Sequence, residues 1–261
     1  MRTLIVGNGH GIGLALTKRL LGDGNDVVGV SRHFLDPICD RHTQHVLDAL
    51  DPGFPESIAK IVAEKSPIDT LVYCAGIGEP FETSGVDRDG DTIRVNLAAL
   101  ADAVRAVLPS MRARESGRII GVSSIGDRAS PTAPGYSASK AGMTTYLLGL
   151  RGALRKSGVR VSVVRFGFVD TKMAKAKVRP LMITADRAAE ILLGVIRHGP
   201  AVKTYPLAME VLISVASAPT SWRMRARPFP AIIEALSMAA AGQETSQTAL
   251  STGRQKVPPR T

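Results

Sequence analysis

Leu4-Ile5-Val6-Gly7-Asn8-Gly9-His10-Gly11-Ile12-Gly13 is the stretch that decides the fold predicted for this sequence. An apolar run leads into closely spaced glycines, and residues 14–21 then repeat apolar side chains with helical spacing. A tight turn between a strand and a helix favours glycine, because glycine tolerates a positive φ and lets a pyrophosphate approach the backbone. The free N–H groups at the start of the helix attract the same anion. The stretch therefore predicts a dinucleotide site made by Gly7, Asn8, Gly9, His10, Gly11, Ile12 and Gly13.

Downstream of this turn, short apolar segments alternate with helical patterns. Strands are expected at residues 27–30, 45–47, 70–73, 118–122 and 159–164, and helices at residues 57–65, 89–114, 136–155 and 186–197. This alternation predicts a Rossmann-like α/β fold, a doubly wound parallel sheet with helices on both faces. The length of 261 residues suits a single domain of this kind better than two domains.

That domain is expected over residues 1–240, and the Gln/Ser/Thr-rich residues 241–261 are expected to form a disordered tail. Within the domain, the basic residues 170–185 are expected to form a substrate loop, and residues 205–240 an apolar and basic C-terminal segment. A buried helix or a subunit contact is the favoured interpretation of this last segment, although its arginines would also suit an anionic membrane surface.

The composition restricts the classes of function. The formal net charge is +10 and the pI is about 10, but no nucleic-acid-binding motif accompanies the excess of arginine and lysine. Cys39 and Cys74 provide neither a disulfide framework nor the spacing of metal ligands. No apolar run approaches the roughly 18–20 residues that cross a bilayer, and a strand begins almost at Met1. We therefore expect a cytoplasmic protein that binds a small molecule, with no metal and no nucleic acid.

The segment Tyr136-Ser137-Ala138-Ser139-Lys140 carries the chemistry that the sequence predicts. A Tyr and a Lys four residues apart lie on one face of a helix. The ammonium favours the phenolate, so we expect a lowered pKa for Tyr136 and proton exchange with an alcohol or a carbonyl near neutral pH. Such a pair occurs by chance on many helices. Its significance comes from the glycine turn and from Ser123-Ser124 at the end of a predicted strand.

The end of the second predicted strand bears on the identity of the cofactor. An acidic residue there would bind the ribose hydroxyls of NAD, whereas an arginine accepts the 2′-phosphate of NADP. This sequence has Ser31-Arg32-His33 at that point, and His10 in the glycine turn is placed to approach the same phosphate. NADP(H) is therefore favoured over NAD(H). The alternative is a solvated Arg32 and a protein that accepts either cofactor.

Across residues 2–200 the chain resembles the short-chain dehydrogenase/reductase family. The spacing Gly7-x-x-x-Gly11-Ile12-Gly13 is similar to the cofactor fingerprint of the family, and Tyr136-x-x-x-Lys140 is similar to its active-site helix. The resemblance adds to the cofactor site, beside Ser31, Arg32, Tyr136 and Lys140, the residues Asp48, Ala75, Gly76, Asn96, Val169 and Thr171. The chain departs from the family pattern at Val6, Tyr73-Cys74 and Phe166, all in supporting positions around the cofactor.

The resemblance implies reversible hydride transfer between a nicotinamide cofactor and a carbonyl/alcohol pair, with NADPH-dependent reduction expected. It implies that Tyr136 is the general acid/base, that Ser124 binds the carbonyl oxygen, that Lys140 holds the nicotinamide ribose and that Asn96 anchors a water. Strand register favours Ser124 for its role, whereas the spacing to the tyrosine in many relatives selects Ser123. A homodimer or homotetramer is also implied. The alternative function is a regulator on the same fold that binds NADP without turnover.

Overall fold

The computed structural model describes residues 1–81, 88–130, 132–174 and 179–216. Its strands are β1 (Arg2–Val6), β2 (Asp26–Ser31), β3 (His42–Val46), β4 (Thr70–Tyr73), β5 (Gly117–Ser124), β6 (Val159–Phe166) and β7 (Val202–Tyr205). Its helices are α1 (Gly11–Gly22), α2 (Phe54–Lys65), α3 (Asp89–Ile93), the π-helix η1 (Arg94–Ala98), α4 (Ala99–Ala113), α5 (Pro134–Ala153), α6 (Ala185–His198) and α7 (Leu207–Ala216).

The strands form one seven-stranded sheet in the order β3-β2-β1-β4-β5-β6-β7, and every pair of neighbours is parallel. The chain first builds the sheet outward from β1 to β3 and then returns to add β4 on the other side of β1. This reversal leaves a crevice at the carboxyl ends of β1 and β4, where α/β proteins of this kind bind ligands. The predicted fold class, a doubly wound parallel sheet in one domain, is confirmed.

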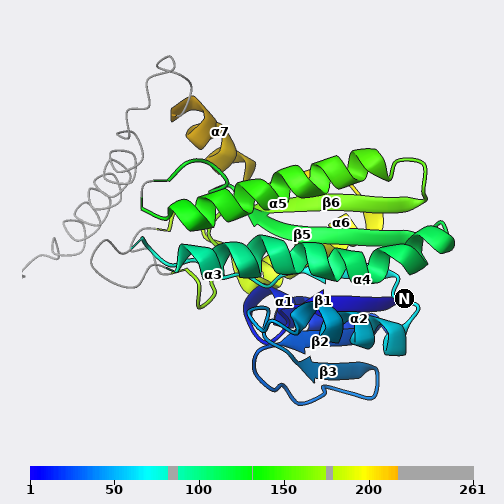
Figure 1. Cartoon of the computed structure of the whole chain (residues 1–261). Helices are drawn as coiled ribbons and strands as arrows, with labels where there is room; N and C mark the ends of the chain where they lie inside the picture. Colours follow the sequence, from blue (N-terminus) through cyan, green and yellow to red (C-terminus); the bar gives the residue numbers. More distant parts are fainter. Residues whose placement is uncertain (82–87, 131, 175–178, 217–261) are drawn as a thin grey trace, which may run out of the picture.

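Helices cover both faces of the sheet (Figure 1). The helices α2, α4 and α5 pack on one face, and α1 and α6 pack on the other. Successive strand side chains alternate between the two layers, so Leu4 packs with α2 and α4 while Ile5 packs with α1 and α6. Because both faces are buried, the central strands are almost entirely apolar, which is the pattern that made them recognisable in the sequence.

Two edge strands differ from the prediction. The third strand was expected at residues 45–47, but β3 begins at His42 and pairs with β2 through polar residues. Its apolar Val46 is 57% exposed, so apolarity is a poor guide to this strand. The other edge strand, β7, was not predicted, because its sequence Val-Lys-Thr-Tyr is short and half exposed. An edge strand is held mainly by backbone hydrogen bonds to its single neighbour, and these leave little mark on the sequence.

The helix expected over residues 89–114 is divided into α3, η1 and α4. The interruption is the π-helical turn that contains Asn96, whereas Pro109 lies inside α4 without ending it. The apolar residues after 206 begin as α7, whose Met209 is buried and whose Leu207 is exposed. The predicted tail at residues 241–261 and most of the C-terminal segment lie outside the described residues.

Within the part of the chain that the structure describes, no helix is both long and apolar enough to cross a membrane. Over the same residues, no three side chains of His, Cys, Asp or Glu gather as metal ligands would.

Candidate active site

A cavity of about 650 Å³ opens at the carboxyl ends of the central strands. Most of the residues that the sequence singled out line it. They are Gly7, Gly9, His10, Gly11, Ile12, Gly13, Ser31, Arg32, Asp48, Ala75, Gly76, Ser124, Tyr136, Lys140, Val169 and Thr171. The side chains of the two predicted asparagines, Asn8 and Asn96, take other directions and are buried in the protein.

The glycine turn forms one end of the cavity, and its geometry requires glycine at two positions. Gly7 has a φ of +94°, and a Cβ there would lie 2.4 Å from the backbone nitrogen of Ala75. A Cβ at Gly13 would lie 2.2 Å from the carbonyl oxygen of Gly7. The side chain of His10 does not cap α1, so the N–H groups of its first turn remain available to a ligand. The turn is therefore a close-packed backbone cradle at a helix N-terminus.

Asn8 supports this turn from behind instead of facing the cavity. Its side chain is fully buried, donates to Gln44 Oε1 at 2.7 Å and accepts from Gln44 Nε2 at 3.2 Å. Gln44 Nε2 also donates to Ser31 Oγ at 3.0 Å. Gln44 thus connects the glycine turn to the loop that begins at Ser31. Nothing in the sequence pointed to Gln44, because it lies on the edge strand whose position was predicted incorrectly.

The loop after β2 gathers positive charge near the glycine turn. Burial lowers the pKa of His10, and its electrostatic interactions with Lys172, Arg32 and His33 lower it further. His10, Arg32 and His33 all line the cavity. Asp48 lines the same end of it, and its Oδ1 accepts a hydrogen bond from the backbone N–H of Leu50 at 3.0 Å. Arg32 and Lys172 therefore bring positive charge to this part of the cavity, and Asp48 brings one carboxylate.

Tyr136 and Lys140 lie one turn apart on α5, as their spacing predicted, with Lys140 Nζ 5.9 Å from the centre of the phenol ring. Lys140 is 4% exposed, and its Nζ donates to the carbonyl oxygen of Val122 at 2.9 Å. Burial lowers the pKa of Lys140 to about 8. Burial also raises the pKa of Tyr136, against the opposing effect of its hydrogen bond with Ser124. The lowered pKa expected for Tyr136 is not found, because desolvation of the phenolate outweighs the groups that favour it.

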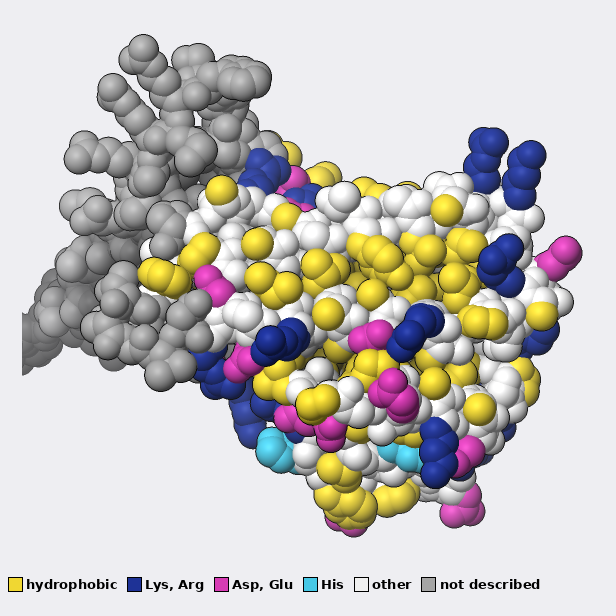
Figure 2. Space-filling model, in the orientation of Figure 1, with side chains coloured by type: hydrophobic (Ala, Val, Ile, Leu, Met, Phe, Trp, Pro, Cys, Tyr) yellow, Lys and Arg dark blue, Asp and Glu magenta, His cyan; other side chains and the backbone are white. Residues whose placement is uncertain are grey.

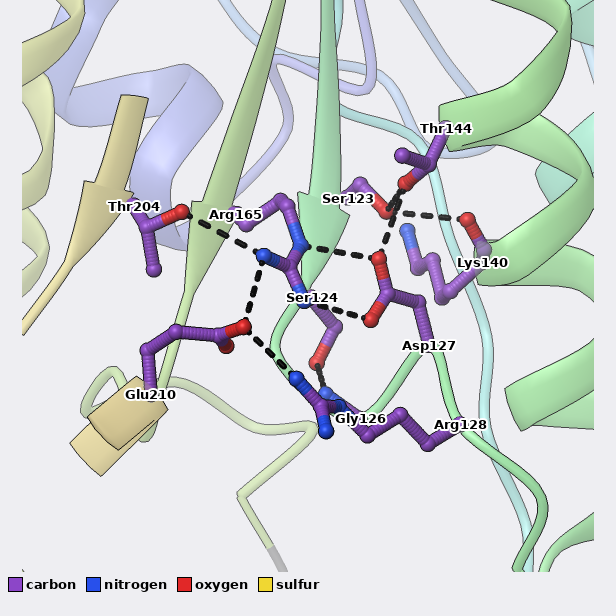
Figure 3. Close-up of polar contacts among 10 residues, drawn as sticks. All are labelled: Ser123, Ser124, Gly126, Asp127, Arg128, Lys140, Thr144, Arg165, Thr204 and Glu210. Atoms are coloured by element: carbon purple, nitrogen blue, oxygen red, sulfur yellow. Dashed lines mark hydrogen bonds and ion pairs between the residues drawn. The ribbon is translucent and has the colours of Figure 1, made fainter. Parts of the chain in front are cut away.

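Ser123 and Ser124 end β5, and their side chains leave opposite sides of the strand (Figure 3). The Ser124 hydroxyl accepts a hydrogen bond from the backbone N–H of Gly126 at 3.0 Å and is hydrogen-bonded to the Tyr136 side chain. Ser123 Oγ donates instead to the backbone carbonyl of Lys140 at 3.0 Å. Ser124 is therefore the serine that lies beside the phenol, whereas Ser123 ties the strand to α5.

Asn96 lies in the π-helix η1 and holds two segments of the site together. Its Oδ1 accepts from the backbone N–H of Ile77 at 2.8 Å, and its Nδ2 donates to the Ile77 carbonyl and to Ser139 Oγ, both at 2.9 Å. The side chain thus fixes the segment after β4 against α5. π-Helical turns are frequent at functional sites, where they redirect a side chain.

Val169 and Thr171 lie in the segment after β6, next to the glycine turn. Val169 forms an isolated parallel bridge with Ile183, and a Cβ at Gly11 would lie 2.9 Å from the Thr171 methyl group.

Among the positions that depart from the family pattern, Phe166 is buried in the core and Tyr73 donates from its hydroxyl to the Val95 carbonyl at 2.5 Å. Tyr73 thus packs within the core, and Phe166 packs in the core while also lining the cavity.

The end of the cavity beyond Tyr136 is bounded mainly by apolar side chains. They are Ile77, Pro80, Ile125, Phe168, Leu181 and Met209. Besides the Ser124 and Tyr136 hydroxyls, the polar side chains of Glu79 and Thr132 also line the cavity. The cavity is therefore lined by three groups of residues: the glycine turn, the polar side chains of Ser124, Tyr136 and Lys140, and a set of apolar side chains.

Comparisons with known proteins agree with this geometry. The family model described as short chain dehydrogenase matches residues 2–181. The 3-oxoacyl-acyl-carrier-protein reductase of Salmonella typhimurium is 29% identical over 199 residues, which are 72% of this chain and 79% of that protein. The oxidoreductase UcpA of Escherichia coli is 32% identical over 190 residues, 67% of this chain and 72% of that protein. A short-chain dehydrogenase from Burkholderia cenocepacia, solved in complex with NADP, superimposes with a TM-score of 0.73 at 25% identity, covering 83% of this chain and 93% of that one.

Proposed function

Because this chain belongs to the short-chain dehydrogenase/reductase family, whose members are NAD(P)-dependent oxidoreductases, we propose that it reduces an apolar carbonyl to an alcohol with NADPH. One observation supports the proposal above the others: Ser124, Tyr136 and Lys140 converge on one wall of a cavity whose other end is a glycine cradle. An amine, a phenol and a hydroxyl in this arrangement suit proton exchange with a substrate oxygen.

The residues present fit a nicotinamide dinucleotide. Gly7 and Gly13 let the turn pack tightly on its own backbone and on Ala75, where any Cβ would meet backbone atoms. The turn lines the cavity with Gly7, Gly9, Gly11 and Gly13, which offer no side chain to keep a pyrophosphate from the backbone. The cavity volume of about 650 Å³ lies within the usual range for cofactor and substrate pockets. When bound, the cofactor supplies or accepts the hydride. We assign its pyrophosphate to the glycine turn, its adenosine to the pocket wall at Asp48, and its nicotinamide end to the segment of Val169 and Thr171.

In the proposed reduction, Tyr136 gives its proton to the substrate oxygen. Its raised pKa suits this role, because a phenol of raised pKa is protonated at neutral pH. Ser124 donates a hydrogen bond to the same oxygen and stabilises the negative charge that develops there. Lys140, with a pKa of about 8, is largely an ammonium near neutrality and serves as donor to the nicotinamide ribose. Asn96 positions the segment after β4 against this helix.

Ser124→Ala and Ser123→Ala form a matched pair on adjacent positions of one strand. We expect Ser124→Ala to lower kcat about a hundredfold, because it removes a donor to the developing charge. Ser123→Ala is expected to keep kcat within a few-fold and to lower the free energy of unfolding by about 1 kcal/mol, because it removes a hydrogen bond to α5. Steady-state kinetics and urea unfolding measure the two effects. Equal losses of kcat in both variants would contradict the assignment of Ser124.

We propose NADP(H) as the preferred cofactor, on the support of the positive charge of Arg32 and Lys172 beside His10. Arg32→Ala is expected to weaken NADPH binding by about 10- to 100-fold, because a charge-assisted hydrogen bond to the 2′-phosphate is lost. NADH binding, which lacks that phosphate, should change less than about twofold. Fluorescence titration measures both constants, and Arg105→Ala on the outer helix α4 is the control. Equal weakening for the two cofactors would mean that Arg32 does not contact the 2′-phosphate.

The apolar end of the cavity supports an apolar substrate class. The curated relative that reduces 3-oxoacyl groups on a carrier protein makes carrier-presented carbonyls one candidate within it. The test is a screen of NADPH oxidation with medium-chain ketones, aldehydes, 3-oxoacyl thioesters and, as the opposite class, charged sugar phosphates and amino acids. Turnover is expected in the apolar classes. Turnover confined to the charged classes would overturn this assignment of the apolar end.

We also propose that the chain is a homodimer or homotetramer. Figure 2 shows hydrophobic side chains gathered over α4 and α5, on the face away from α1 and α6. Ile93 and Leu148, which lie at the end of α3 and on α5, are 41% and 40% exposed. Sedimentation velocity is expected to give a mass of two or four chains, and a monomer at micromolar concentration would contradict the proposal.

A further inference from the structure

A buried ion pair lies directly behind the end of β5. The guanidinium of Arg165 on β6 binds the carboxylate of Asp127 at two points, Nε to Oδ2 at 2.8 Å and Nη2 to Oδ1 at 2.7 Å (Figure 3). The side chains are 13% and 8% exposed. A bidentate pair of this kind is geometrically specific, and removing one partner leaves the other as a costly buried charge.

The pair is connected to helices on both sides of it. Arg165 Nη1 lies 3.2 Å from Glu210 Oε1 on α7, which also accepts from Arg128 Nη2 at 2.7 Å. On the other side, Asp127 Oδ2 accepts from Thr144 Oγ1 on α5 at 3.1 Å. A single carboxylate thus links the loop after β5 to β6 and to the helix that carries the catalytic-type residues.

A short chain of polar contacts continues from Thr144 into the active-site helix. The Thr144 hydroxyl donates to Asp127 and the Ser123 hydroxyl donates to Lys140, so the two hydroxyl oxygens touch without a proton between them. Thr144 Oγ1 lies 2.9 Å from Ser123 Oγ, which donates to the backbone carbonyl of Lys140 at 3.0 Å. Asp127 is therefore coupled to the backbone of the helix turn that carries Lys140. These contacts run along the side of β5 opposite to Ser124, so they leave the Ser124 hydroxyl facing the cavity.

The turn between Ser124 and Asp127 packs directly on the phenol. The backbone N–H of Gly126 donates to Ser124 Oγ, and a side chain added at Gly126 would lie 3.7 Å from Tyr136 Cε1. Asp127 is the next residue in this turn, and its carboxylate raises the pKa of Tyr136, after burial and against the hydrogen bond from Ser124. The turn thus contacts the Tyr136 ring, and the Asp127 carboxylate at its end acts electrostatically on the same phenol.

Within the described residues, other titratable groups lie near the phenol and the carboxylate. Lys140 on α5, Cys74 after β4 and Glu79 in the following segment line the cavity with Tyr136, and Asp89 on α3 lies against Gly135, the residue before it. Arg165 pairs with Asp127, and Glu210 contacts both Arg165 and Arg128, the residue after Asp127. Of these, only the Asp127 carboxylate belongs to the turn that touches the phenol and is also held by a buried cation.

We propose that Asp127 and Arg165 are a pair of positioning residues for Tyr136, which hold the Ser124 turn against the phenol and balance the charge that faces it. The inference rests on the proposed role of Tyr136 in proton exchange, and it adds two residues to that role. Neither touches substrate or cofactor. Their effect passes through the turn and through the electric field at the phenol oxygen.

If Asp127 and Arg165 balance the charge near Tyr136, substituting either one changes the titration of Tyr136. A purely structural role for the pair predicts no such change. Asp127→Asn keeps an acceptor for Thr144 and Arg165 but removes the negative charge, so the phenolate becomes easier to form. Arg165→Gln keeps a donor to Asp127 but leaves its negative charge uncompensated, so the phenolate becomes harder to form. The two variants therefore shift the titration of Tyr136 in opposite directions, although they break the same ion pair.

The first test is the pH dependence of alcohol oxidation with NADP⁺, in which the phenolate is the active form. For the wild type we expect kcat/KM to rise with pH as the coupled Tyr136 and Lys140 pair loses a proton. We expect the rising limb to move to lower pH by roughly half a unit or more in Asp127→Asn, and to higher pH by a similar amount in Arg165→Gln. Glu210→Gln, which contacts only the arginines, is the control and should shift the limb less than Asp127→Asn.

A second readout needs neither substrate nor cofactor. Nuclear magnetic resonance of protein labelled at the tyrosine ring carbon bearing oxygen follows Tyr136 directly, with its signal identified by its loss in Tyr136→Phe. The same opposite shifts are expected there, so a failure of the proposed reaction in the assay would not obscure the inference. Shifts of both variants in one direction, or no shift in either, would overturn it. If Arg165→Gln fails to fold, Asp127→Asn alone decides, because an unchanged or raised titration midpoint contradicts the proposal.

Discussion

Tyr136→Phe is expected to lower carbonyl turnover about a thousandfold, because it removes the only proposed proton donor to the substrate oxygen. The substitution takes away one hydroxyl and leaves the ring that packs against Gly78 and Gly126. Cofactor binding should therefore remain within about twofold of wild type, since the glycine cradle and the Arg32 loop are untouched. Stopped-flow measurement of NADPH oxidation and fluorescence titration of NADPH separate the two quantities.

The matched control for this variant is Tyr146→Phe on the same helix. Tyr146 is half-buried, and it is not among the residues that line the cavity. The Tyr146→Phe variant should therefore keep the turnover of the wild type. Wild-type activity in Tyr136→Phe would remove this phenol from the mechanism. Equal losses in Tyr136→Phe and Tyr146→Phe would point to a general disturbance of α5.

Gly13→Ala is expected to weaken NADPH binding by more than about a hundredfold, because the added methyl group cannot be accommodated without moving the turn. A Cβ there would lie 2.2 Å from the Gly7 carbonyl oxygen, which is backbone and cannot rotate away. The displaced turn would no longer present its N–H groups in the arrangement that a pyrophosphate needs. Isothermal titration with NADPH measures the loss.

Two further glycines provide controls for this prediction. Gly22 lies in the same helix with open space around its Cβ position, so Gly22→Ala should bind NADPH normally. At Gly9 a Cβ would lie 3.1 Å from the Cβ and Oγ of Ser31, a milder contact than the one at Gly13, so Gly9→Ala should lie between the other two. If Gly13→Ala does not fold, the contrast between Gly9→Ala and Gly22→Ala still tests the cradle. Equal binding in those two variants would contradict it.

The sequence predicted those parts of the molecule whose signal is local. The strand, glycine turn and helix at Leu4 to Leu21 are contiguous, and Tyr136 and Lys140 share one helix, so spacing alone places their side chains. The edge strands β3 and β7 were misplaced or missed, because backbone pairing holds them without an apolar pattern. The π-helical turn at Asn96 likewise has no counterpart in hydrophobic periodicity.

Features that depend on distant segments were not accessible from the sequence. The direction of the Asn8 side chain is set by Gln44, 36 residues away on an edge strand. The pKa of Tyr136 was predicted from Lys140 alone, whereas burial, which no local spacing reveals, decides its direction. The pairing of Asp127 with Arg165 joins residues 38 positions apart in the sequence. Neither residue lies in a motif that the sequence singled out.

The central claim is that this chain transfers hydride from NADPH to a carbonyl at the Tyr136 site. The most direct measurement incubates the protein with an apolar ketone or aldehyde and NADPH that carries deuterium at the transferable position, followed by mass spectrometry of the product. We predict an alcohol that carries one deuterium at the former carbonyl carbon, formed by wild type and nearly absent with Tyr136→Phe. Tight NADPH binding without deuterium transfer to any of the ketones, aldehydes and 3-oxoacyl thioesters tested would contradict the claim and would favour a cofactor-binding regulator.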